Sequence, residues 1–158
     1  MTAVHLDAWY VTGIVEGEGS FCVSFNHRSR LNVGIETRPS FSITLSERDR
    51  ALIELLQDYF KCGAIRYSRA DRTYKFEVRS VEEIVTRVVP QFRRYPLRGS
   101  KRNDFELFAL ICALIQQRRH LDPNGLREII ELAFQMNPSG KRRLAKDELL
   151  RVLEKVKV

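Results

Sequence analysis

Residues 8–25, AWYVTGIVEGEGSFCVSF, join a short helical pattern to an alternating one. Two glycines, Gly13 and Gly17, lie in the helical part, where each costs about 1 kcal/mol relative to alanine. From Ser20 onward the apolar period is two, which is typical of a strand. Because glycine places no side chain in the way, a helix with this pattern is expected to let another backbone approach closely.

The two glycines share one side of the predicted motif helix, residues 7–19. At 100° per residue, that side carries the candidate dimer-interface residues Trp9, Thr12, Gly13, Glu16 and Gly17. The partner on this side is either a second copy of the helix or, alternatively, the chain's own sheet.

Glu18 lies at the C-terminal end of the motif helix, where the unpaired carbonyls and the helix dipole are already negative. A carboxylate in this position is unfavourable unless a cation accompanies it. If the helix pairs with a symmetry mate, two Glu18 carboxylates converge with helix-end carbonyls, including that of Gly17. Oxygen ligands of this kind suit Mg²⁺. Glu18 and Gly17 are therefore the candidate metal ligands.

Hydrophobic periodicity predicts an α+β fold with the element order αββαββα and extra C-terminal helices. The expected strands are 20–26, 38–45, 64–68 and 73–80, and the expected helices are 7–19, 46–63, 80–89 (ending before Pro90), 103–117, one after the turn 122–125, and one from about 146. The strands should form a four-stranded antiparallel sheet within about 20–79, covered by helices on one face. The C-terminal helices occupy about 100–158, and the whole chain, 1–158, is expected to be a single domain.

The outward-facing positions of the expected strands are polar and mostly basic. The chain carries 27 Lys and Arg against 20 Asp and Glu, a net charge of +7, and such a balance favours a polyanionic partner, usually nucleic acid. An ordinary solvated sheet face is the alternative. The candidate DNA-binding residues on the strands are Ser20, Cys22, Ser24, Asn26, Arg28, Arg30, Arg38, Ser40, Ser42, Thr44, Arg66, Ser68, Thr73, Lys75 and Arg79.

Composition argues against several other classes of protein. Three cysteines without a CxxC pair and three scattered histidines favour neither a disulfide framework nor a zinc site. No apolar run approaches the roughly 20 residues of a membrane span, and the first residues do not resemble a signal peptide. We therefore expect no membrane association and a protein that stays in the compartment where it is made.

The segment VTGIVEGEGSF, residues 11–21, resembles the LAGLIDADG motif, with Glu16 and Glu18 where that family usually has Asp. Later segments resemble further landmarks of the family in the same order: PSFSITLSERDRALIELL (39–56), YPLRGSKRNDFELF (95–108) and MNPSGKRRLAKDELL (136–150). The resemblance covers essentially the whole chain. With one copy of the motif, the chain resembles single-motif homing endonucleases that work as homodimers.

The resemblance implies a site-specific DNA endonuclease that binds double-stranded DNA as a homodimer. Two αββαββα halves meet through their motif helices, and each sheet lies in the major groove. At about 3.3 Å per strand residue and 3.4 Å per base pair, one sheet of roughly nine-residue strands covers about nine base pairs. The implied product is a double-strand break with 3′ overhangs in a long, near-palindromic target.

The family also implies roles for individual residues. Glu18 is the catalytic, metal-binding acid, with Mg²⁺ or Mn²⁺ as the cofactor, whereas Ca²⁺ could bind without supporting cleavage. Lys101 is the candidate basic residue that steers the attacking water, with Arg98 and Arg102 as substitutes. The loop residues Lys141, Arg142 and Arg143 are expected to contact the DNA backbone.

One position departs from the family pattern. Leu45 occupies the end of the second strand, where many relatives carry Gln. The contact that this Gln would make to a water molecule is therefore missing, or is supplied by Thr44, Ser46 or Arg50.

Two other functions fit the same scaffold. One is an RNA-splicing maturase that binds intron RNA, and the other is a DNA-binding regulator without catalytic activity. The expected location is the cytoplasm with access to the nucleoid in a prokaryote, or an organelle or the nucleus in a eukaryote.

Overall fold

The computed structural model describes residues 3–137 and 140–156, and its helices and strands follow the predicted order. In chain order they are α1 (Ala8–Glu18), β1 (Gly19–His27), β2 (Ile35–Ser46), the 3-10 turn η1 (Glu47–Asp49), α2 (Arg50–Phe60), β3 (Ala64–Ser68), β4 (Thr73–Val78), α3 (Val81–Glu83), the π-helical turn η2 (Ile84–Val88), α4 (Val89–Arg94), α5 (Lys101–Gln116), the 3-10 turn η3 (Arg119–Leu121), α6 (Pro123–Ala133) and α7 (Lys146–Glu154).

The four strands form one antiparallel sheet in the order β1-β2-β4-β3, which confirms the predicted fold class. In the register of β2 and β4, Phe41 lies opposite Val78 and Ile43 opposite Phe76. These four side chains are fully buried. Because side chains alternate along a strand, the polar residues between them lie on the opposite face of the sheet, as the periodicity predicts.

The described chain groups into two compact units, each built from segments that are distant in sequence. Of the described residues, the first contains 3–21 and 40–102, and the second contains 22–39, 103–137 and 140–156. The prediction of one domain over 1–158 stays a prediction.

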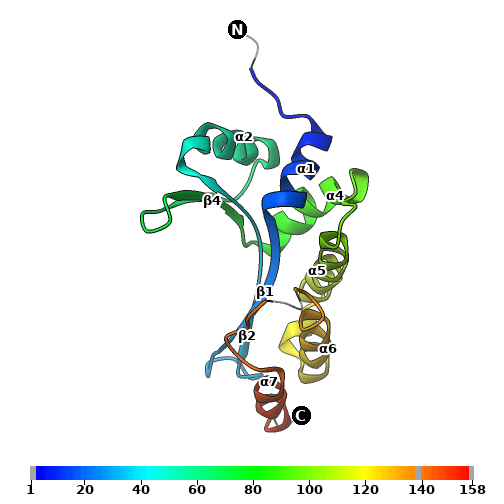
Figure 1. Ribbon diagram of the computed structural model, residues 1–158. Coiled ribbons are helices and arrows are strands. Elements are labelled where there is room, and N and C mark those ends of the chain that lie inside the picture. Colours follow the sequence, from blue (N-terminus) through cyan, green and yellow to red (C-terminus); the bar gives the residue numbers. More distant parts are fainter. Residues whose placement is uncertain (1–2, 138–139, 157–158) are drawn as a thin grey trace. The chain divides into compact units, whose positions relative to one another are not determined.

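Aromatic side chains from the sheet and its helices form the core of the first unit. The Phe41 ring lies 5.3 Å from that of Phe21 and 5.8 Å from that of Phe92, and the Phe60 ring stacks on that of Phe76 at 5.8 Å. Helix α2 packs on β4 and β3 (Figure 1). Helix α2 therefore covers this side of β3 and β4, while α1 packs on α4.

Pro90 does not end its helix, which corrects the predicted stop at residue 89. The helical path continues through α3, η2 and α4, and Pro90 lies in the first turn of α4, where a missing N–H is tolerated. One turn earlier the ladder widens, since the N–H of Val89 donates to the carbonyl of Ile84. After this π-helical turn, α4 presents Gln91 and Phe92, and Gln91 contacts α1.

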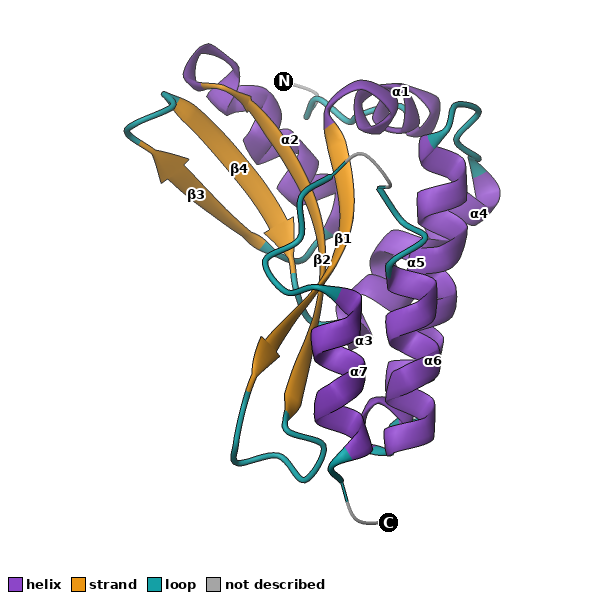
Figure 2. Ribbon diagram, turned by 60° about the horizontal axis from the view of Figure 1, so that its bottom comes forward, coloured by secondary structure: helices purple, strands orange, loops and turns teal. Residues whose placement is uncertain are grey.

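In the second unit, helices α6 and α7 lie side by side (Figure 2). The Phe25 ring on β1 stacks on that of Phe134 at a centroid distance of 6.4 Å. The segment 122–125 starts α6 rather than forming a separate turn, because the Asp122 carboxylate accepts a hydrogen bond from the N–H of Gly125 at 2.9 Å. In the part of the chain that the structure describes, every helix is too short or too polar to cross a bilayer.

Candidate active site and DNA interface

The glycine face of α1 is open in the single chain. Among the described residues, apart from the adjacent ones and the backbone of the helix itself, no atom lies within 4 Å of a Cβ built at Gly13 or Gly17. The neighbouring Tyr10 and Trp9 side chains are about half exposed, at 50% and 48%. The exposed face therefore runs from these aromatic rings along the two glycines to the end of the helix.

Thr12 lies on the other side of α1, which corrects its assignment to the interface. It is buried, and its Oγ1 donates to the carbonyl of Tyr95 at 2.8 Å and accepts from Gln91 Nε2 at 3.2 Å. Gln91 also donates to the carbonyl of Ala8 at 2.8 Å. These bonds fix α1 on α4. The open face of α1 therefore includes Tyr10 in place of Thr12. A helical projection centred on the two glycines would have predicted this position of Tyr10.

Glu16 is partly exposed, and its carboxylate interacts with backbone groups of its own chain. Its carboxylate accepts hydrogen bonds from the backbone N–H groups of Arg98 and Gly99, at 3.1 to 3.3 Å. The side chain of Glu16 thus anchors the loop that precedes α5, and its place in a dimer interface stays a prediction.

Lys101, the first residue of α5, is bound to the end of α1. Its Nζ donates to the carbonyls of Val15 at 2.8 Å and Glu16 at 2.9 Å. A cation at a helix C-terminus is favourable because it complements the helix dipole and adds a donor to the carbonyls there; the Val15 carbonyl also accepts from the N–H of Gly19. Lys101 thus places a cation at the C-terminal end of α1, the end that also carries Glu18.

Gly19 follows α1 in an extended conformation, with φ −82°. A Cβ at this position would lie 2.5 Å from Cγ1 and 2.9 Å from Cα of Val15. The glycine is therefore required by the close approach of β1 to the last turn of α1, and this approach places Glu18 at the corner between helix and strand.

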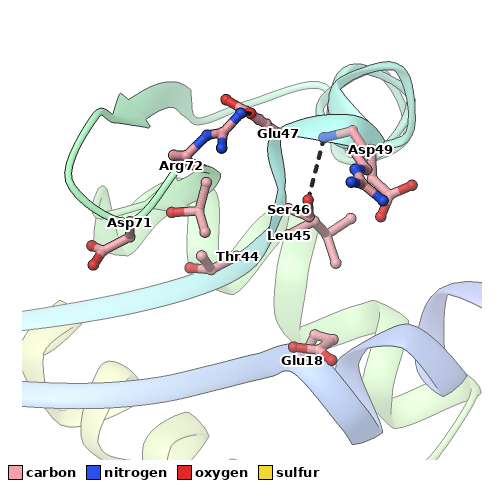
Figure 3. A pocket seen from close by; sticks show the side chains of 10 residues that line it. Glu18, Thr44, Leu45, Ser46, Glu47, Asp49, Asp71 and Arg72 are labelled. Carbon is pink, nitrogen blue, oxygen red and sulfur yellow. Dashed lines mark hydrogen bonds and ion pairs between the residues drawn. The ribbon is translucent and has the colours of Figure 1, made fainter.

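Glu18 is exposed and lines a pocket of about 680 Å³. The other residues lining this pocket are Thr44, Leu45, Ser46, Glu47, Arg48, Asp49, Asp71, Arg72 and Thr73. Figure 3 shows Glu18 across from the end of β2. Among the described residues, no group of three or more His, Cys, Asp or Glu side chains could hold a metal ion, so one chain supplies Glu18 without further clustered side-chain ligands.

The end of β2 beside Glu18 is formed by Thr44, Leu45 and Ser46 (Figure 3). The Ser46 hydroxyl accepts a hydrogen bond from the N–H of Arg48 at 3.4 Å and caps η1. Arg50 points elsewhere, since its Nε pairs with Glu54 at 3.0 Å and its guanidinium lies over the Tyr74 ring. Of the three predicted substitutes for the missing Gln, Thr44 and Ser46 line this pocket and Arg50 does not.

Within the same pocket, Glu47 belongs to a hydrogen-bonded cluster. Tyr67 donates to it at 2.7 Å and Arg72 pairs with it at 2.6 Å. The bond from Tyr67, followed by that from Arg72, lowers the pKa of Glu47. This carboxylate is therefore ionised at neutral pH and engaged by its own neighbours.

The candidate DNA-binding residues predicted on the strands differ in exposure, and Arg28, Arg30 and Arg79 lie beyond the ends of β1 and β4. Ser20, Cys22, Ser24, Arg28, Arg30, Arg38, Arg66 and Arg79 are exposed, and Asn26, Ser40, Thr44, Ser68, Thr73 and Lys75 are partly exposed. Ser42 is buried although it lies on the polar face. It lies opposite Glu77 on the central strands, where neighbouring side chains cover it, so its expected direct contact with DNA is corrected.

Two acids that the sequence analysis did not include lie among these basic residues. Glu77 on β4 accepts a hydrogen bond from Ser40 at 2.7 Å and pairs with Lys75 at 3.3 Å and Arg79 at 2.8 Å. Burial raises the pKa of Glu77, but the bond from Ser40 and the two cations outweigh it, and the net pKa is lowered. The Glu77 carboxylate is therefore charged and nearly buried, and it lies at the centre of the group formed with Ser40, Lys75 and Arg79.

Glu36 on β2 is the second such acid. It pairs with Arg28 at 3.3 Å and with Arg38 at 3.1 Å. The Ser24 hydroxyl donates to the carbonyl of Arg38 at 3.4 Å. The alternation of the strands showed which face these residues share, whereas their pairing depends on side-chain conformations that periodicity does not specify.

Lys141 and Arg143 are exposed in the loop before α7, but Arg142 is not free for phosphate. The Arg142 guanidinium donates to the carbonyls of Val23, at 2.6 Å, and Ala133. It also lies 4.6 Å from the centroid of the Phe134 ring. The predicted backbone contact of Arg142 is therefore corrected: the residue ties this loop to β1 and α6.

Comparison with known proteins matches this arrangement to one family. The family model of the LAGLIDADG endonuclease matches residues 11–112. The probable intron-encoded endonuclease 2 of Neurospora crassa is 32% identical over 133 residues, which are 84% of this chain and 29% of that protein. The chain thus spans less than a third of this relative's length.

Solved structures give the same match over nearly the whole chain. The homing endonuclease I-TnaI is 30% identical, with a TM-score of 0.83, over 98% of this chain and 100% of that one. I-SmaMI bound to uncleaved DNA target in the presence of calcium ions is 29% identical, with a TM-score of 0.85, over 95% of this chain and 49% of that one.

Proposed function

Because this chain belongs to the LAGLIDADG endonuclease family, we propose that it is a site-specific homing endonuclease that acts as a homodimer. It hydrolyses both strands of a long, near-palindromic DNA target with the help of a divalent metal ion and leaves 3′ overhangs. It acts where its host DNA is found: in a prokaryotic cytoplasm with access to the nucleoid, or in a eukaryotic organelle or nucleus.

The observation that carries this proposal is the open glycine face of α1, which ends at the exposed Glu18. The face has room for a second backbone at Gly13 and Gly17. The lengths of the similar structures support a second copy, since the chain matches all of the I-TnaI chain but half of the DNA-bound I-SmaMI chain. Two copies of this chain therefore correspond in length to one I-SmaMI chain.

The residues at the end of α1 fit a hard divalent cation. Glu18 offers a carboxylate and Gly17 a carbonyl, and oxygen donors of this kind hold Mg²⁺ or Mn²⁺. One chain provides no larger cluster among its described residues, so the partner's Glu18 and the DNA phosphates complete the ligands. The bound ion would activate water and stabilise the leaving 3′ oxygen.

Lys101 and Glu16 hold the reacting end of the protein in place. Lys101 binds the helix-end carbonyls, and Glu16 binds the loop that leads to Lys101. The position of Glu18 is thereby set before DNA binds, and such preorganisation favours the transition state. In the family's mechanism Lys101 also polarises the attacking water.

The polar face of the sheet reads the target. Its arginines and lysines suit guanine edges and phosphates, and its Ser, Thr and Asn side chains suit several bases. The exposed Lys141 and Arg143 add phosphate contacts outside the groove. The net charge of +7 supports attraction to a polyanion.

The experiment is a cleavage selection with Glu18→Gln as the test variant and Glu54→Gln as the control. Glu54 is an exposed acid that pairs with Arg50, so its variant makes the same change of charge away from the site. Wild-type protein and Mg²⁺ are incubated with a randomised duplex pool, and the cleaved ends are sequenced.

Wild type and Glu54→Gln should cut one long motif and leave 3′ overhangs, with Mn²⁺ replacing Mg²⁺ and Ca²⁺ supporting binding without cleavage. Glu18→Gln should bind the same motif and cut it at least about 1000-fold more slowly, since several kcal/mol of transition-state stabilisation are lost. Undiminished cutting by Glu18→Gln would refute the assignment. Specific binding to intron RNA with no DNA cut would support the maturase instead.

A further inference from the structure

On the polar face of the sheet, the acidic side chains are less exposed than the arginine side chains that they bind. The Glu77 side chain is 6% exposed, whereas the Arg79 side chain that it binds is 54% exposed. The Glu36 side chain is 25% exposed, and that of its partner Arg38 is 51% exposed. In both pairs the carboxylate lies at the level of the sheet and the guanidinium extends toward solvent.

Both arginines are held through the same nitrogen. Nε of Arg79 contacts Glu77 Oε1 at 2.8 Å, and Nε of Arg38 contacts Glu36 Oε2 at 3.1 Å. A guanidinium bound at Nε can still present its two Nη groups to another partner. That pair of donors matches the O6 and N7 acceptors of guanine.

Glu77 also uses its second oxygen. Oε2 accepts from Ser40 and pairs with Lys75, so one carboxylate connects residues from β2 and β4. A long basic side chain loses considerable rotamer freedom when it is fixed on binding. Side chains that are already fixed in the free protein lose less, and their direction is defined before contact.

The same carboxylates oppose binding to DNA of any sequence, because they bring negative charge toward the phosphates. Non-specific affinity depends mainly on the number of phosphates neutralised by Lys and Arg. An acid among the arginines is therefore expected to weaken general affinity while it defines the geometry of base contacts. The two effects have opposite signs and can be measured separately.

We propose that Glu77 is a positioning residue for DNA sequence recognition: it orients Arg79 and Lys75 toward base edges and reduces affinity for unrelated DNA. Glu36 acts in the same way on Arg38 and Arg28, at a separate block of base pairs. This inference rests on the proposed function, since it requires the polar face to read DNA.

The test compares wild type with Glu77→Gln, Glu36→Gln and the control Glu54→Gln. Each variant removes one negative charge, and Glu54 pairs with Arg50 on α2 rather than with the basic residues of the polar face. The proteins are equilibrated with a randomised duplex pool in Ca²⁺, the bound DNA is sequenced, and affinity is measured for the preferred duplex and for a scrambled one. Thermal unfolding of each variant is recorded alongside.

Glu77→Gln should reduce base preference about tenfold at a few adjacent base pairs, within the range expected for one bidentate contact. Its affinity for the scrambled duplex should be equal to or higher than that of wild type. Glu36→Gln should relax a different block, and Glu54→Gln should leave every preference unchanged. Because Glu36 is more exposed, its variant tests the idea even if Glu77→Gln is unstable.

Three outcomes would overturn the inference. Unchanged base preferences in both variants would mean that the acids position nothing. A uniform increase in affinity with the same preferences would mean that they act only through charge, and a uniform loss that follows a lower melting temperature would mean that they act only through stability. If wild type itself shows no sequence preference, the proposed function fails instead, which separates the two conclusions.

Discussion

Lys101 binds the backbone carbonyl of Glu16, and the Glu16 side chain binds the loop just before Lys101. Lys101 Nζ donates to the backbone carbonyl of Glu16 at 2.9 Å, while the Glu16 carboxylate accepts from the N–H groups of Arg98 and Gly99 in the loop that leads to Lys101. The end of α1 and the start of α5 are thus fixed to one another. The carboxylate of Glu18 extends from this fixed corner.

Replacing Lys101 should loosen that corner. Lys101→Met removes two charge-assisted hydrogen bonds and should lower the free energy of unfolding by about 2 kcal/mol, or the melting temperature by about 4–8 °C. Cleavage should fall much further than DNA affinity. Lys155→Met, at an exposed lysine, is the control for both measurements. Equal melting curves for Lys101→Met and wild type would show that the helix end needs no cation.

The two ends of the glycine segment should respond differently to added side chains. Gly13→Leu has open space in the single chain, so the monomer should stay folded, but sedimentation velocity should show loss of the dimer. Gly19→Ala should instead lower the free energy of unfolding by about 1–3 kcal/mol, because its Cβ would lie 2.5 Å from Val15. A stable dimer of Gly13→Leu would place the interface elsewhere.

Substitutions at two neighbouring residues of the loop before α7, Lys141 and Arg142, should affect DNA binding and stability separately. Arg142→Ala removes the guanidinium that donates to the carbonyls of Val23 and Ala133 and should lower the melting temperature. Lys141→Ala should leave the melting curve unchanged and reduce the slope of log affinity against log salt by about one. The reverse pattern, with Arg142→Ala changing only the salt slope, would return Arg142 to the DNA interface.

Acid should weaken the protein partly through Glu77. Its pKa is lower in the folded chain than the ordinary value of 4.5, so its contribution to stability is present above pH 4.5 and is lost as the pH falls through the folded-state pKa. Urea unfolding between pH 6 and pH 3 should therefore show a smaller loss of stability for Glu77→Gln than for wild type. Parallel curves for the two proteins would mean that the ion pairs around Glu77 stabilise nothing.

The sequence predicted the fold well because its periodicities are clean. Alternation identified all four strands and the face that carries Phe41 and Ile43, and one glycine-rich segment located the exposed end of α1. The stop before Pro90 was wrong because a proline in the first turn of a helix costs little when a wider turn precedes it.

The contacts at the candidate site that the sequence did not predict share one physical cause. Thr12, Glu16 and Arg142 are polar residues that bind backbone groups of distant segments, and such partners depend on tertiary packing rather than on spacing along the chain. For the same reason Glu77 was not recognised as the centre of its cluster. Lys101 was identified through its resemblance to a family landmark, and its bonds to α1 could not be derived from the sequence.

The most direct test of the central claim is the number of protein chains on one cleavable duplex. Native mass spectrometry of wild-type protein with its selected DNA in Ca²⁺ should give two chains per duplex, and Gly13→Leu should abolish that complex together with cleavage. A single chain per duplex that cuts both strands at the wild-type rate on addition of Mg²⁺ would contradict the account.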